Sequence, residues 1–264
     1  MIDALRFESA RIRTVWSTYW LAGSALVLCA LATLAFVYDT DRSEPMSWQF
    51  VATVLTAGGA ELPFSMVAVF TSLIGIFATG HEYRHGTILP TLTAMPRRTA
   101  LLAAKAIVVA VASALIALAS LVVCWTTGTV VRAEPIPLGE GDTLAVLAGY
   151  VVLVTLCGVL GTALGQLTRA IPGPIVIILM APLVVEPLIQ ALAQLEALSF
   201  LRHALPYLPF AAGMQLVRAE PVSPVDRGSP VIELLSRWEG GTVFALFIGV
   251  VLVIAWRLFL RRDA

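Results

Sequence analysis

Long runs of apolar residues constrain the fold of this chain more than any other feature. Six such runs, residues 20–37, 62–80, 100–126, 144–167, 171–192 and 242–260, reach or approach the ~20 residues that an α-helix needs to cross a bilayer. Charged residues make up 13% of the chain, whereas soluble domains carry roughly 25%. Helices satisfy their own backbone groups in lipid. The sequence therefore predicts an all-α membrane protein, a single transmembrane domain over residues 1–264 with six spans.

The first nineteen residues have the pattern of an interfacial helix. Apolar side chains recur at spacings of three and four, and basic ones occupy other faces. The apolar set is Ile2, Leu5, Ile12, Trp16 and Tyr19, and the polar set is Arg6, Glu8, Arg11 and Arg13. We expect residues 1–19 to lie on the membrane with the basic side towards the headgroups. The alternative is a plain cytoplasmic extension of the first span.

Two further apolar segments are too short or too interrupted to predict as spans. Residues 48–60 are either an outer extension of the second span or an interfacial segment, and the sequence leaves both open. Residues 198–217 contain Arg202, His203, Pro206 and Pro209, and each proline removes a backbone donor. Within the outer segment 196–241 we therefore expect short re-entrant or interfacial helices, packed against protein where they reach membrane depth.

Basic residues favour one orientation for six spans. One side then holds the arginines near residues 6–13, 84–98 and 257–262, Lys105 and Arg169, while the other holds fewer, mostly in a long loop. A seventh span would place Arg257, Arg261 and Arg262 on the poorer side. The sequence predicts a multi-pass membrane protein with both termini cytoplasmic.

The strongly polar stretch at residues 81–98, between the second and third spans, allows two interpretations. His81-Glu82-x-x-His85 matches a zinc metalloprotease pattern, in which two histidines on one helix face hold the ion and the glutamate activates water. Arg84 would place a positive charge beside the metal, and Gly86 would tend to end the helix. The third histidine, His203, falls on the opposite side in the expected topology.

The second interpretation of the same stretch is a cytoplasmic coupling segment. Gly86 can end the second span, Thr87 can cap a new short helix, and Pro90 then falls in the first turn, where no donor is lost. Such a capped helix between two spans is suited to docking in a groove of a partner. An ordinary polar loop, with Arg97 and Arg98 as topology determinants, fits the residues equally well on physical grounds.

A family resemblance favours the coupling interpretation. The residues that carry it lie in 82–105. They are Glu82, Tyr83, Arg84, Gly86, Thr87, Ile88 and Leu92, then Pro96, Arg97 and Arg98, and then Lys105 at the entry to the third span. This stretch resembles the connection between the second and third spans of ABC-type exporter permeases, in the small six-span type-2 class common in actinobacteria, which implies a location in the bacterial cytoplasmic membrane. The layout of the whole chain is also similar to that class.

The resemblance implies that the chain acts together with partner proteins, one of which hydrolyses ATP. The permease would dimerise with itself or with a closely related permease, and each half would dock on one of two copies of a separate ABC ATPase. Residues 81–98 would form the coupling helix region, with the amino-terminal helix on the same partner. The chain has no G-x-x-x-x-G-K-[ST] loop, so we expect ATP and Mg to be bound by the partner, with no cofactor in this chain.

Glu186 is the most informative charge within the predicted spans. Carboxylates at membrane depth are rare and face a bundle interior or a wet cavity. Gln190 lies one turn on, and Pro182 and Pro187 bend the same span. Glu186, Pro187 and Gln190 are candidates for an outer gate on a substrate path. The alternatives are that Glu186 reaches water near the outer boundary or is hydrogen-bonded within one subunit.

The function expected from the sequence is ATP-driven export by a dimeric permease, an efflux role for which no chemistry in this chain is predicted. The substrate would be amphipathic or hydrophobic, a drug, lipid or peptide antibiotic, and no nucleic acid is expected as a partner. Two rivals remain, the membrane-embedded zinc protease and a non-transporting sensor or assembly subunit.

Overall fold

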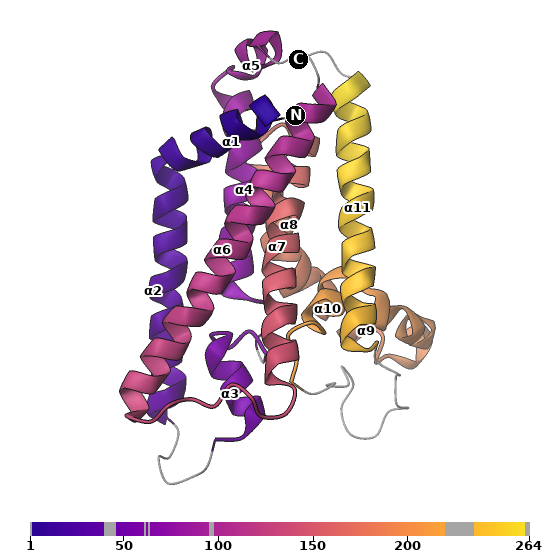
Figure 1. The fold of residues 1–264 in the computed structure, drawn as a ribbon. Coiled ribbons are helices and arrows are strands. Elements are labelled where there is room, and N and C mark those ends of the chain that lie inside the picture. The colour runs from indigo at the N-terminus through magenta and orange to yellow at the C-terminus, as the bar shows by residue number, and fades with distance from the viewer. Residues whose placement is uncertain are drawn as a thin grey trace.

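The computed structural model describes residues 2–39, 46–60, 62, 64–94, 98–219 and 235–261. These parts of the chain are helical and contain no strand. The helices run largely along one direction and form an elongated bundle, with one helix lying across its upper end (Figure 1). The all-helical class predicted from the sequence is confirmed.

Within the described residues, five helices are long and apolar enough to cross a membrane. They are α2 (Trp16–Asp39), α6 (Arg98–Arg132), α7 (Thr143–Thr168), the composite of α8 (Pro172–Met180), η1 (Ala181–Val185) and α9 (Glu186–Leu192), and α11 (Arg237–Arg261). The predicted run 62–80 corresponds to α4 (Met66–Arg84), which is not one of the five. Its last turn, His81 to Arg84, is polar and lowers its mean hydropathy.

The helices α4 and α7 form the centre of the bundle through small and hydroxyl-bearing residues. A side chain added at Gly161 of α7 would place its Cβ 2.0 Å from the carbonyl oxygen of Ser72 on α4. Ser72 Oγ donates to Cys157 O at 3.0 Å, and Thr71 Oγ1 donates to Val154 O at 3.2 Å. Close backbone approach with hydroxyl hydrogen bonds is typical of helix pairs within membranes.

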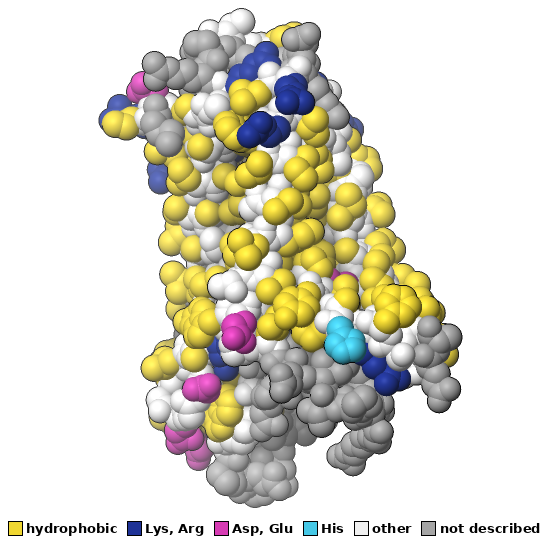
Figure 2. Space-filling view, turned by 90° about the vertical axis from the view of Figure 1, so that its right-hand side faces the viewer, with side chains coloured by type: hydrophobic (Ala, Val, Ile, Leu, Met, Phe, Trp, Pro, Cys, Tyr) yellow, Lys and Arg dark blue, Asp and Glu magenta, His cyan; other side chains and the backbone are white. Residues whose placement is uncertain are grey.

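The other long helices pack around this pair. α6 packs against α7 and α2, and α11 packs against α7 and the short helix α10 (Pro209–Met214). Most of the composite helix from Pro172 to Leu192 is exposed, with apolar side chains such as Val184 and Leu188 on its surface. Exposed apolar side chains cover the middle of the face that includes α11 (Figure 2). Such a belt suits contact with lipid chains.

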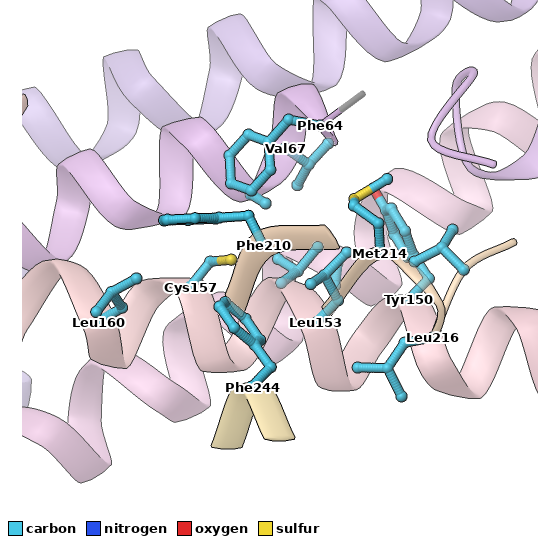
Figure 3. Packing of buried hydrophobic residues seen from close by; sticks show 14 of the residues in the cluster. Phe64, Val67, Tyr150, Leu153, Cys157, Leu160, Phe210, Met214, Leu216 and Phe244 are labelled. Carbon is cyan, nitrogen blue, oxygen red and sulfur yellow. The ribbon is translucent and has the colours of Figure 1, made fainter. Parts of the chain in front are cut away.

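The predicted short helices after the fifth span are present, and the second of them is well packed. They are η2 (Glu196–Tyr207) and α10 (Pro209–Met214). Phe210 of α10 lies between Phe64 and Phe244, with ring centroids 5.5 and 5.8 Å apart (Figure 3). Met214 and Leu216 are buried in the same cluster. Residues 220–234, the rest of this segment up to α11, lie outside the described part.

The segment 48–60, which the sequence left undecided, begins with a separate short helix. α3 (Trp48–Leu55) starts at Ser47, whose side chain accepts a hydrogen bond from Phe50 N at 3.3 Å. Its residues from Val51 to Leu55 are buried, and the chain then turns at Ala57 and Gly58 with φ of 52° and 80°. α3 packs between α6 and α7 and does not continue α4.

The amino-terminal helix is shorter than the sequence predicts. α1 (Ile2–Thr14) ends before Val15, and α2 begins at Trp16, so Trp16 and Tyr19 belong to α2 instead of α1. α1 lies across the end of the bundle and meets α2 at a corner (Figure 1). No glycine or proline marks this corner, and Ala4 and Glu8 of α1 are buried against the bundle.

Candidate functional site

Residues 81–98 join α4 to α6 through a short helix at the upper end of the bundle. α4 continues to Arg84, and Gly86 follows with φ of 66°, a left-handed conformation that commonly ends helices. α5 (Ile88–Ala94) then begins directly after Thr87 and forms the outermost helix at this end (Figure 1). The helix stop at Gly86 and the restart after Thr87 are as predicted. Residues 95–97, including Arg97, lie outside the described residues.

The predicted coupling residues divide between an inner and an outer side. Glu82 and Ile88 are buried, and Tyr83 is half-buried. Arg84, Gly86 and Thr87 are exposed, as is Leu89 with 55% of its surface accessible. Leu92 lies in α5, and Arg98 begins α6. The described part of the segment therefore has an exposed outer surface and an inner surface attached to the bundle.

Glu82 is the centre of a buried ionic cluster that joins three helices. Its Oε1 lies 2.6 Å from Nζ of Lys105 on α6, and it also pairs with Arg11 of α1. The same Lys105 Nζ lies 2.8 Å from Oε1 of Glu8 on α1. Arg11 lies 3.5 Å from Glu8 and donates to Ala78 O on α4. We call these four side chains, Glu8, Arg11, Glu82 and Lys105, the ionic cluster.

The ionic cluster is balanced in charge and largely removed from water. It holds two carboxylates and two cations, and Glu8, Glu82 and Lys105 are each less than 5% exposed. Burial lowers the pKa of Arg11, and the carboxylate of Glu8 acts in the opposite direction. Arginine nevertheless remains protonated. Because an unpaired buried charge is costly, each member holds the others in place. The cluster fixes α1 across the ends of α4 and α6.

Three further contacts connect the segment to the rest of the bundle. Gln166 Nε2 of α7 donates to the Tyr83 hydroxyl, and the Arg169 guanidinium lies 5.3 Å from the centre of the Tyr83 ring. Arg98 Nη1 donates to Phe259 O of α11 at 3.1 Å. These contacts join the end of α4 to α7 and the start of α6 to α11.

A cavity of about 370 Å³ opens between α1, the start of α2 and the end of α4. Its wall combines apolar side chains, among them Phe7, Ile74 and Phe77, with His81 and His85. The His81 ring stacks on Phe77 at 4.8 Å, and the two histidine rings are 6.0 Å apart. Across the described residues, no three His, Cys, Asp or Glu side chains gather where they could hold a metal ion. The zinc alternative thus has two histidines there and no complete ligand set.

Glu186, the candidate gate residue, is bonded within the chain. It is 6% exposed, and its two carboxylate oxygens accept from Phe210 N at 2.8 Å and Ala211 N at 2.7 Å. These amides belong to the first turn of α10, where donors lack partners in the helix itself. The π turn of η1 directly precedes Glu186. Pro187 is exposed, and Gln190 is half-buried one turn on. These hydrogen bonds agree with the alternative in which Glu186 is bonded within one subunit, and the gate role stays a prediction.

Sequence reasoning missed the partners of Glu82. Glu8 was assigned to the polar face of an interfacial helix, and Lys105 to the entry of a span. One signal was available, since Lys105 is the only lysine among seventeen basic residues and lies inside an apolar run. A charge in such a position needs a buried counter-ion. The sequence did not show which carboxylates would supply it.

No protein-family model matches the chain, and no curated protein is significantly similar to it. The geometry of the chain itself therefore carries the functional argument.

Proposed function

We propose that this chain is the membrane-spanning permease subunit of an ATP-driven exporter of the ABC type. In this proposal α4 also crosses the membrane and brings the number of spans to six. Its 19 residues measure about 28 Å, close to the ~30 Å thickness of a hydrocarbon core. α1 would lie at the interface, and both termini would be cytoplasmic. The chain would sit in a bacterial cytoplasmic membrane and work as a dimer with two ATPase subunits.

One observation carries the proposal, namely the combination of an exposed short helix with a buried ionic cluster directly beneath it. α5 projects beyond the ends of α4 and α6, and Arg84 and Leu89 are exposed there. An apolar and a basic side chain on one projecting surface suit a protein partner, with apolar contact supplying affinity and charge fixing register. Glu82 then connects that surface to three helices. A force on α5 would act on α1, α4 and α6 together.

In this mechanism the residues have separate roles. Arg84, Gly86, Thr87 and Leu89 belong to the contact surface, and Arg97 and Leu92 are assigned to it from the sequence. Glu82, Tyr83, Ile88 and Arg98 are positioning residues. ATP binding would close the two partner subunits, α5 would follow, and the spans would change from inward to outward access. The substrate would be hydrophobic or amphipathic, because the exposed and buried walls of the helices are mostly Leu, Val, Ala and Phe.

The first test is to identify the protein that binds this chain. Purification of the chain from its native membrane in mild detergent should yield a second protein that carries a phosphate-binding loop and hydrolyses ATP. Arg84→Ala should then lower ATP hydrolysis by the reconstituted complex severalfold, with unchanged membrane insertion and thermal stability, because Arg84 is exposed. Glu82→Ala should lower both hydrolysis and stability.

Arg261→Ala provides a matched control, since Arg261 is also exposed at this end of the bundle but lies on α11. It should leave hydrolysis unchanged. Recovery of the chain without any ATPase, or equal hydrolysis in the Arg84 and Arg261 variants, would reject the proposal and favour a sensor or assembly subunit.

A further inference from the structure

A second hollow in the described part of the chain lies on the side of the bundle, between α6 and α11. Its volume is about 310 Å³, and its lining is almost entirely apolar. Thr99, Leu102, Ala103 and Ala106 form one wall, and Leu252, Val253 and Trp256 form the other. We call this hollow the α6–α11 groove. None of these residues belongs to the coupling segment or to the ionic cluster.

The groove exists because small side chains face large ones. Ala103 and Ala106 leave space on α6 where α11 presents Leu252 and Trp256, and Leu102 forms a buried floor. Thr99 is exposed, and Val253 is 51% exposed, so the groove opens to the surroundings of the bundle. Within a membrane those surroundings are acyl chains, and an open apolar groove of this shape admits one of them.

The upper end of the groove carries positive charge. The Arg257 guanidinium lies 5.7 Å from the centre of the Trp256 ring, which itself lines the groove. Arg98 and Arg261 lie at the same end of the two helices. Figure 2 shows basic side chains gathered above the apolar middle of this face.

No carboxylate on either helix offsets this charge near the groove. α6 contains no Asp or Glu, and Glu239, the single acidic residue of α11, lies in the first turn at the opposite end. Tryptophan and arginine side chains are typical of the headgroup level of a bilayer. A basic site at that level attracts anionic lipids.

We propose that the α6–α11 groove is a binding site for an anionic glycerophospholipid. One acyl chain would lie along Ala103 and Ala106, beneath Trp256, and the phosphate would lie against Arg257. The bound lipid would fill the space between these two helices, beside the hydrogen bond from Arg98 Nη1 to Phe259 O. This inference goes beyond the proposed function and requires only that the bundle lie in a membrane.

Photolabelling tests the proposal. The purified full-length chain is placed in nanodiscs of phosphatidylcholine containing a small fraction of phosphatidylglycerol with a photoreactive group in its acyl chain. Adducts mapped by peptide mass spectrometry should concentrate in residues 99–106 and 252–256. Phosphatidylcholine with the same label should give severalfold fewer adducts there.

Two variants separate the parts of the site. Ala106→Leu should abolish labelling of the groove by filling it, whereas Ala114→Leu, on α6 but outside the groove, should not. Arg257→Gln, at an exposed position, should weaken phosphatidylglycerol labelling about fivefold, the factor expected for one basic side chain near an anionic surface.

Three outcomes would overturn the inference. They are equal labelling by the two headgroups, labelling spread evenly over all exposed helices, and labelling unaffected by Ala106→Leu. A disulfide between two chains through Val253→Cys, with the groove unlabelled, would also overturn it and assign the groove to a second copy of the chain.

Discussion

Two buried glutamates, Glu82 and Glu186, are stabilised in different ways at different levels of the bundle. Glu82 pairs with the side chains of Arg11 and Lys105, which come from two other helices. Glu186 accepts hydrogen bonds from two backbone amides of α10 and has no ion pair among the described residues. The first arrangement depends on four side chains together, whereas the second depends on one side chain and a helix end.

The difference indicates where the molecule can change shape. Removing one member of a balanced buried ionic cluster leaves an uncompensated charge, so α1, α4 and α6 are held together as one unit. If α10 moves away from Glu186, no second charge is left unpaired, although two amides of α10 then lose their acceptor. We therefore expect the end with the ionic cluster to move as a rigid body and α10 to be the more easily displaced element.

The largest expected effect is that of Lys105→Met. Without the ammonium group, Glu8 and Glu82 share only Arg11, and the loss of a buried partner should lower the free energy of unfolding by about 3–5 kcal/mol. Unfolding by heat or denaturant in detergent micelles measures it. The double variant Glu8→Gln with Lys105→Met, which restores charge balance, should recover part of the loss. A single variant as stable as the wild type would show that the ionic cluster does not hold the helices.

A smaller effect is expected for Glu186→Ala. Two amides of α10 lose their acceptor, which should cost about 1–3 kcal/mol, and α10 should become more accessible to hydrogen exchange. Glu186→Gln keeps one acceptor oxygen and should cost less than Glu186→Ala. If Glu186→Ala destabilised the chain more than Lys105→Met, the contrast between the two glutamates would be reversed.

Local features were predictable from the sequence because they depend on neighbouring residues. The helical class follows from the apolar runs, and the helix end at Gly86 follows from the freedom of glycine at positive φ. The short helices around Pro209 follow from the prolines, which start a helix but interrupt a span. The locations of five long helices also agree with the predicted runs.

Features that depend on distant residues were not predictable. Glu8 and Lys105 lie far apart in the sequence, and nothing local shows that they form an ion pair. The corner at Val15 carries no glycine or proline that would have predicted it, and the contacts of α1 there are with distant helices. The capping of α10 by Glu186 likewise joins distant segments, so the sequence could identify the carboxylate but not its partners.

Site-specific cross-linking tests the central claim, that α5 docks on an ATPase subunit. The three native cysteines are buried, so an introduced cysteine should be the reactive one. Leu89→Cys on α5 is compared with Leu195→Cys, which is similarly exposed but follows α9. With a short bifunctional reagent in native membranes, Leu89→Cys should link the chain to a protein with a phosphate-binding loop, and Leu195→Cys should not. Absence of that product, or equal linking from both positions, would contradict the account.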